Sequence, residues 1–256
     1  MGRYLILLAF LLSSCAPASG ASQAAIPPAV DTAAATSPPA LTPTPAPTAT
    51  AEPPTAVPTE TPAGQIFRDD FSERFQPGWE WEGENVRRWE ITQDGWLQIA
   101  GEDSSLLWEG QQSNVLWRQL PEGDFEITVR VQAAPTADFQ QATIYIYEDS
   151  ENYVALNRGY CSPCGGNAVY MEYKIGGGFG AYKYLTTVTD LYLRLVSIGT
   201  EISGWYSLDG SEWSRLGRFG NFFSFTRVGL GVSNVDRQGI DADLIGRFDF
   251  FEMRRP

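Results

Sequence analysis

The segment Phe125–Val131, FEITVRV, alternates apolar and polar side chains along its whole length. Successive side chains of a β-strand point to opposite faces of a sheet, so this alternation predicts a half-buried strand. Leu191–Val196, LYLRLV, and Arg247–Phe250, RFDF, show a similar pattern. Runs of Gly, Asn and Asp, such as Leu208–Ser211, separate these segments and are typical of turns. Because no apolar stripe of helical spacing and helical length is present, the folded part is predicted to be all-β, an antiparallel sandwich or barrel.

The order of side chains along four neighbouring segments divides them into two faces. One set is aliphatic and is predicted to form the core: Ile144, Ile146, Val154, Leu156, Val169, Met171, Leu191, Leu193 and Leu195. The opposite set is rich in tyrosine, with polar residues between the rings: Tyr145, Tyr147, Tyr153, Asn157, Tyr170, Glu172, Tyr192 and Arg194. The two sets cannot mix without a bulge, because a shift of one residue turns every side chain to the other face. Tyr182, Tyr184 and Trp205 are candidates to join the tyrosine-rich face.

The N-terminus has the layout of an export signal. Arg3 supplies one positive charge, and the apolar run Tyr4–Leu12 is too short to span a bilayer. Leu12–Cys15, LSSC, resembles a bacterial lipobox, which implies that residues 1–14 are a lipoprotein signal peptide and that Cys15 is lipidated with acyl chains such as palmitate. Several chains give stable anchoring, whereas a single chain binds a membrane only marginally. An ordinary secretory signal with a chance cysteine is the alternative.

Residues 15–64 are predicted to be a disordered linker that starts at the lipidated cysteine. Residues 16–64 hold 12 of the 17 prolines and no aromatic residue, and the rest is mostly Ala and Thr. Such a composition cannot bury enough apolar surface to offset the entropy lost on ordering. Because proline favours an extended chain, the linker is expected to be a semi-rigid spacer.

Residues 65–256 hold all 8 tryptophans and 10 of the 11 tyrosines and are predicted to be one folded domain. The 17 Lys and Arg against 28 Asp and Glu give this part a net charge of −11, which disfavours nucleic acid as a partner. The chain contains no His. This absence removes the commonest zinc ligand, the usual general base and any Ser-His-Asp triad.

Several motifs follow one another in an order that is recognisable as a set. They are FRDDF (67–71), WEW (79–81), WLQI (96–99), FQQATIYIY (139–147), NYVAL (152–156), LRL (193–195), YSLDGSEW (206–213), VGLGV (228–232) and FDFF (248–251). The set resembles the concanavalin A-like domain at the C-terminus of bacterial β-xylosidases, over nearly all of residues 66–254. The resemblance implies a jelly-roll sandwich of two curved antiparallel sheets with paired terminal strands. It also implies that a concave sheet is the place to look for sugar binding.

The tyrosine-rich face is the candidate glycan site. Sugar rings present C–H groups that pack on aromatic faces, while their hydroxyls need polar donors and acceptors. The residues predicted to bind carbohydrate, which supply both kinds of contact, are Tyr145, Asn157, Tyr170, Glu172, Tyr182, Arg194 and Trp205. The alternative is that these side chains cover the sheet or lie under loops, as part-buried Tyr and Trp commonly do.

A catalytic alternative needs paired carboxylates on either side of a bond. Glu122–Glu126, EGDFE, is similar to the E-x-D-x-E strand of concanavalin A-like glucanases. However, Pro121 and Gly123 indicate a turn at its start, so we interpret the segment as a turn and a solvated strand face and predict no catalytic residue.

Two further sites follow from residue type and spacing. Cys161 and Cys164 have metal or redox spacing, but no second pair and no His complete a zinc site, so a disulfide is predicted outside the cytoplasm. Asp69, Asp70 and Asp249 are candidate ligands of a structural calcium ion, because the resemblance places their strands side by side and carboxylates suit Ca²⁺.

We therefore predict a surface-anchored lipoprotein of the cell envelope whose non-catalytic, lectin-like domain binds a polysaccharide or glycoconjugate outside the cytoplasm. The chain is expected to contact the membrane through its lipid anchor only and to require no cofactor. Two alternatives stay open: a glycoside hydrolase acting on β-glycans, and a structural or protein-binding lipoprotein of the envelope.

Overall fold

The computed structural model describes residues 64–102, 114–220, 224–234 and 243–256. The predicted signal peptide, the lipidation site at Cys15 and the linker up to residue 63 lie outside these ranges, so they stay predictions. Within the described ranges, no helix is long and apolar enough to cross a bilayer.

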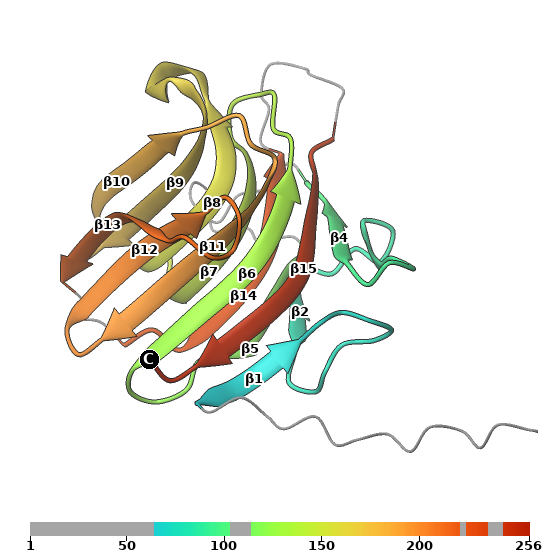
Figure 1. Ribbon diagram of the computed structural model, residues 1–256, viewed down its shortest axis with the longest axis horizontal. Coiled ribbons are helices and arrows are strands. Elements are labelled where there is room, and N and C mark those ends of the chain that lie inside the picture. Colours follow the sequence, from blue (N-terminus) through green and yellow to red (C-terminus); the bar gives the residue numbers. More distant parts are fainter. Residues whose placement is uncertain (1–63, 103–113, 221–223, 235–242) are drawn as a thin grey trace, which may run out of the picture. The chain divides into compact units, whose positions relative to one another are not determined.

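Two antiparallel sheets make up the fold, and sheet A is the layer nearer the viewer in Figure 1. Its strands run in the order β13 (Ser214–Gly220), β12 (Glu201–Ser207), β11 (Asp190–Ile198), β6 (Phe125–Ala133), β15 (Ile245–Arg254), β4 (Leu97–Ala100) and β3 (Trp89–Ile91), with β1 (Gln65–Asp69) paired to β15. The alternating segment Phe125–Val131 belongs to β6, in the middle of this sheet.

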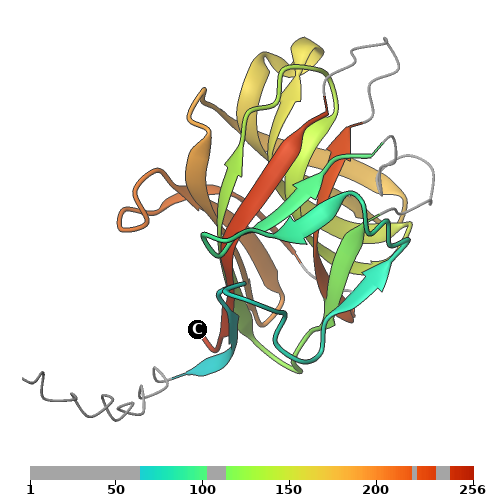
Figure 2. The same cartoon turned by 90° about the vertical axis from the view of Figure 1, so that its right-hand side faces the viewer.

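Sheet B is the second layer. Its strands run in the order β10 (Gly178–Leu185), β9 (Gly166–Ile175), β8 (Asn152–Cys161), β7 (Gln140–Asp149), β14 (Arg227–Asn234), β5 (Val115–Gln119) and β2 (Glu80–Glu82). A short 3₁₀ turn, η1 (Ser162–Cys164), joins β8 to β9. Figure 2 turns the molecule by 90° and brings the short strands β2 to β4, in cyan and green, to the front.

The core lies between the inner faces of the two sheets. All nine aliphatic residues predicted to form it are fully buried there, so the parity of the four strands is confirmed. Full burial of each such side chain stabilises the folded state by roughly 1.5–3 kcal/mol. All-β architecture with two antiparallel sheets agrees with the predicted sandwich.

The two ends of the described domain meet at one edge of sheet A. β1 pairs with β15 in antiparallel register, with Asp69 opposite Phe251. The rings of Phe67 and Trp79 pack on Phe251, with centroid distances of 6.1 and 4.9 Å. The pairing of terminal strands that the resemblance implied is therefore present.

Candidate functional site

The seven residues predicted to bind carbohydrate do not share one surface. Four of them, Tyr145, Asn157, Tyr170 and Glu172, lie on the outer face of sheet B, on the neighbouring strands β7, β8 and β9. Asn157 is the cross-strand partner of Tyr170, and Glu172 lies one row along, beside Ala155. The predicted grouping of these four is therefore correct.

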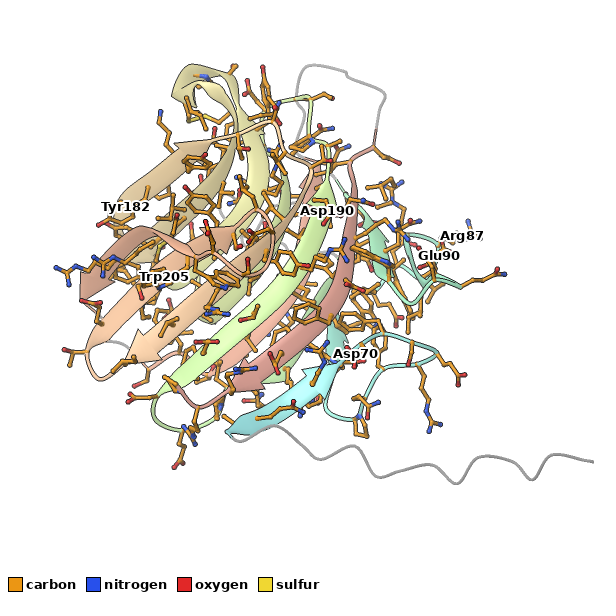
Figure 3. All side chains as sticks on the ribbon, in the orientation of Figure 1. Asp70, Arg87, Glu90, Tyr182, Asp190 and Trp205 are labelled. Atoms are coloured by element: carbon orange, nitrogen blue, oxygen red, sulfur yellow. A yellow bond between two sulfur atoms is a disulfide. The ribbon has the colours of Figure 1, made fainter. Side chains whose placement is uncertain are left out.

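The other three lie elsewhere. Arg194 and Trp205 are direct cross-strand partners on β11 and β12, so they belong to the outer face of sheet A (Figure 3). Tyr182 points between the sheets, where its ring covers Gly217 and its hydroxyl donates to the carbonyl of Arg218 at 2.7 Å. The prediction of one platform was wrong for Arg194 and Trp205, because parity does not assign a strand to one of the two sheets. Tyr182 is the cross-strand partner of the core residue Met171, so it points inward with Met171.

The tyrosine-bearing part of sheet B is closed to solvent. The side chains of Tyr145 and Tyr170 are 2% and 3% exposed, and Asn157 is fully buried. The hydroxyl of Tyr170 donates to the carbonyl of Gly166 at 2.5 Å. In this arrangement neither ring offers a face on which a sugar could stack, so these residues do not form the open platform that was predicted.

A half-buried carboxyl group lies at the centre of this region. Glu172 accepts hydrogen bonds from the amides of Gln141 and Asn157, at 2.9 and 3.0 Å. Burial raises the pKa of Glu172 above its ordinary value, and the two hydrogen bonds only partly oppose that shift. Burial likewise raises the pKa of the neighbouring Tyr145 to about 12, so the phenol stays neutral at physiological pH.

An open cavity lies further along the same outer face, over β2, β5 and β14. It has a volume of about 470 Å³. Its lining includes two carboxylates, a guanidinium group, an amide and an indole, contributed by Glu80, Glu82, Arg227, Gln119 and Trp117. Glu80 and Gln119 are exposed at its rim. The cavity is lined mostly by polar groups beside an indole, and convergent polar groups of this kind can fix the orientation of a bound small molecule.

The indole of Trp117 lies flat across β14 because the residue opposite it is a glycine. Gly229 pairs with Trp117 in the sheet, and a Cβ atom at that position would lie 2.4 Å from the indole ring. Trp117 also contacts Tyr145 and Tyr147, with ring centroids 6.1 and 5.5 Å away. The buried tyrosines and the open cavity are therefore parts of one continuous aromatic surface.

Arg227 covers this surface at the cavity. Its guanidinium carbon lies 4.3 Å from the ring centroid of Trp117 and 4.6 Å from that of Tyr147. Its Nη1 atom donates to the Glu82 carboxylate at 2.8 Å. The cavity could not be predicted from the sequence. The pairing of β2, β5 and β14 brings together residues about 145 positions apart. The tyrosine-rich face, which included Tyr147, was the one sequence signal that pointed toward it.

The outer face of sheet A carries arginines that stack on aromatic rings and pair with acids. The guanidinium carbon of Arg194 lies 3.7 Å from the ring centroid of Trp213, and its Nε lies 3.3 Å from the Glu126 carboxylate. Arg130 binds Asp190 at 2.9 Å in the middle of this face (Figure 3). These charges satisfy one another, so the face resembles an ordinary solvated sheet surface.

The three carboxylates predicted to hold calcium do not converge. Asp69 is 1% exposed and binds protein donors, Asp70 binds Arg68 at 2.5 Å, and Asp249 binds Arg130 at 3.1 Å. Among the residues that the structure describes, no group of three or more His, Cys, Asp or Glu residues could hold a metal ion. The resemblance correctly placed β1 beside β15, but adjacent strands do not by themselves turn their carboxylates toward one point.

The carboxylate-rich segment Glu122–Glu126 is a turn followed by the start of β6. Gly123 has a positive φ of 77°, and the Asp124 carboxylate accepts the backbone N–H of Gly199 at 2.7 Å. Only Glu126 lies in the strand, where it faces Arg194. The three acids therefore do not form one row along a strand.

The two cysteines of the folded domain form a disulfide bond. Cys161 ends β8, Cys164 ends η1, and their Cα atoms are 5.1 Å apart. The Asp138 carboxylate accepts hydrogen bonds from the backbone and hydroxyl of Ser162 inside the closed loop. The arrangement is that of a crosslinked hairpin turn.

The described domain matches a known family over most of its length. A sequence model of the β-xylosidase C-terminal concanavalin A-like domain matches residues 68–254. No curated protein sequence matches the chain.

Solved structures share the fold at low sequence identity. The GH43 protein BlXynB from Bacillus licheniformis is 20% identical, with a TM-score of 0.65; the match covers 74% of this chain and 39% of that chain. A xylan β-1,4-xylosidase from Bacillus halodurans C-125 is 16% identical, with a TM-score of 0.62, over 80% of this chain and 41% of that chain. A glycosyl hydrolase family protein from Mycobacterium fortuitum is 12% identical, with a TM-score of 0.51, over 74% of this chain and 99% of that chain. The chain thus spans about two-fifths of the first two proteins.

Proposed function

Because the chain belongs to the family of β-xylosidase C-terminal concanavalin A-like domains, we propose that its folded domain is a non-catalytic module that binds a polysaccharide or glycoconjugate. The observation that carries the proposal is the open cavity on the outer face of sheet B. Its volume of about 470 Å³ falls in the range of sites that bind small molecules or short segments of a polymer.

The polar groups of the cavity suit the hydroxyls of a sugar. The Glu80 carboxylate accepts hydrogen bonds, and the Gln119 amide both donates and accepts them. Trp117 lies beneath them under the Arg227 guanidinium, and it offers apolar surface to ring C–H groups where that guanidinium moves aside. The net charge of −11 over residues 65–256 favours neutral glycans over acidic ones.

Binding of the full chain to immobilised neutral polysaccharides, such as xylan and β-glucan, tests this function. The double substitution Glu80→Ala with Gln119→Ala removes two exposed rim groups, so we expect affinity to fall at least tenfold, about 1.4 kcal/mol or more. Glu212→Ala, an exposed carboxylate of the turn after β12, serves as the matched control and should bind like the wild type. Unchanged binding by the double variant would show that the cavity is not the glycan-binding site.

Hydrolysis of a β-glycan is a second candidate function, because Glu80 and Glu82 both line the cavity. Alternate residues of a strand are about 7 Å apart, within the separation that glycosidases use for their two carboxyl groups. We favour binding because Arg227 already engages the Glu82 carboxylate. Release of reducing sugar by the wild type, lost in Glu80→Gln, is the result that would establish the enzyme instead.

We further propose that lipid at Cys15 anchors the domain to the cell envelope. The LSSC segment before the linker supports this lipid anchoring. The composition of the Pro-rich linker suits a spacer between the anchor and the domain. Cys15→Ser is expected to move the protein from the membrane fraction to the soluble fraction and to abolish incorporation of labelled palmitate. A wild-type protein that takes up no label would exclude the lipid anchor.

A further inference from the structure

The aromatic surface of the cavity is covered by a side chain of the protein itself. The Arg227 guanidinium lies over Trp117 and Tyr147, with centroid distances of 4.3 and 4.6 Å. The Glu82 carboxylate holds this guanidinium in place through a contact of 2.8 Å. Trp117 is consequently only 4% exposed, although it lines an open cavity.

This cover occupies the position that a sugar ring needs. Ring C–H groups bind aromatic faces from the same side and at a similar distance as a stacked guanidinium. A neutral sugar therefore reaches these faces only when Arg227 moves away. Both charged partners are on the surface, since the Arg227 side chain is 28% exposed and that of Glu82 is 37% exposed. A pair of this kind is weak enough to open on binding.

Building on the proposed function, we propose that Arg227 is a specificity-determining cap. It competes with neutral sugar rings for the faces of Trp117 and Tyr147, and Glu82 keeps it in the competing position. The cap weakens binding of single neutral rings, so that only ligands with additional contacts at the rim displace it. Salt that weakens the Arg227–Glu82 pair also favours the open position.

Polysaccharide affinity of the full chain tests the cap. Arg227→Ala should bind neutral β-glycans about tenfold more tightly than the wild type, and Glu82→Gln should shift affinity in the same direction by a smaller factor. Wild-type affinity should rise between 50 and 500 mM NaCl. Arg215→Ala removes a comparable arginine, 5.6 Å from the ring centroid of Trp205 on sheet A, and should change nothing. If either protein binds a glycan, weaker or unchanged binding by Arg227→Ala overturns the cap.

A second readout separates failure of the cap from failure of glycan binding. Without any ligand, Arg227→Ala should make Trp117 accessible, so acrylamide should quench more of its fluorescence than in the wild type. The added quenching should disappear in Arg227→Ala with Trp117→Phe. If it appears while no glycan binds either protein, the cap is correct and the proposed function is wrong. If Arg227→Ala adds no quenching, the cap itself is wrong.

Discussion

A single buried carboxylate organises the chain that follows β1. Asp69 accepts the backbone N–H groups of Phe71 and Gln76 and the indole N–H of Trp79, at 2.9, 2.8 and 2.9 Å. These bonds hold Phe71 in a left-handed conformation with a φ of 48° and place its ring in the core. Hydrogen bonds to a charged group are stronger than neutral ones, so this residue has a structural role.

Asp69→Ala should therefore lower the free energy of unfolding by about 3 kcal/mol, because three donors, one of them fully buried, lose their acceptor. The neighbouring Asp70 is the matched control, since its side chain is 58% exposed and pairs with Arg68 at the surface. Asp70→Ala should stay within about 0.5 kcal/mol of the wild type. Urea unfolding of both variants measures the two free energies of unfolding. Equal losses of stability in the two variants would contradict the structural role of Asp69.

Glu172 makes stability depend on pH in the opposite sense to an ordinary ion-paired acid. Burial raises its pKa in the folded protein above 4.5, its ordinary value, so the folded state retains the proton to higher pH than the unfolded chain does. The free energy of unfolding therefore falls as pH rises from about 4.5 through the folded-state pKa.

Glu172→Gln should remove this dependence and keep the hydrogen bonds from Gln141 and Asn157 to a side-chain oxygen. The variant should be more stable than the wild type at pH 7, and the difference should shrink as the pH falls through the folded-state pKa toward 4.5. Urea unfolding measured from pH 4 to pH 8 tests the prediction. If the free energies of unfolding of the two proteins ran parallel over this pH range, the pKa of Glu172 would not be raised in the folded protein.

At the scale of elements, the β8–β9 hairpin carries the one crosslink in the described part of the chain. The disulfide closes a loop of only four residues, from Cys161 to Cys164. Loop closure of that length stabilises the fold by about 2 kcal/mol, so Cys161→Ser with Cys164→Ser should lower the Tm by roughly 5 °C. Calorimetry with and without reductant measures this. A reductant should lower the wild-type Tm to that of the variant, and a much larger fall would assign the hairpin a wider role.

The strands also show what the sequence could predict. Alternation along β6, β7, β8 and β11 correctly predicted which aliphatic side chains form the core, because a period of two follows from strand geometry alone. It did not predict that Tyr145 and Asn157, on the opposite face of sheet B, are buried as well. It could not tell that Tyr145 and Arg194 lie on opposite outer faces, since sheet membership depends on long-range pairing. The cavity around Trp117 could not be predicted for the same reason, because the strands that form it, β2, β5 and β14, meet only in the folded protein.

At the scale of the whole domain, the two outer faces differ in what they offer a ligand. On sheet A, arginines stack on Trp213 and Trp205, and Arg194, which stacks on Trp213, also pairs with Glu126. On sheet B, buried tyrosines lead into an open cavity with exposed polar groups at its rim. The glycan site that we propose therefore lies on sheet B and not on sheet A.

NMR spectra of the indole N–H groups during titration with neutral β-linked oligosaccharides test this assignment most directly. Single Trp→Phe substitutions identify the signals of Trp117, Trp205 and Trp213. We predict that the Trp117 signal shifts progressively with ligand, while those of Trp205 and Trp213 on sheet A stay in place. Shifts at Trp205 and Trp213 with an unmoved Trp117 would contradict the account.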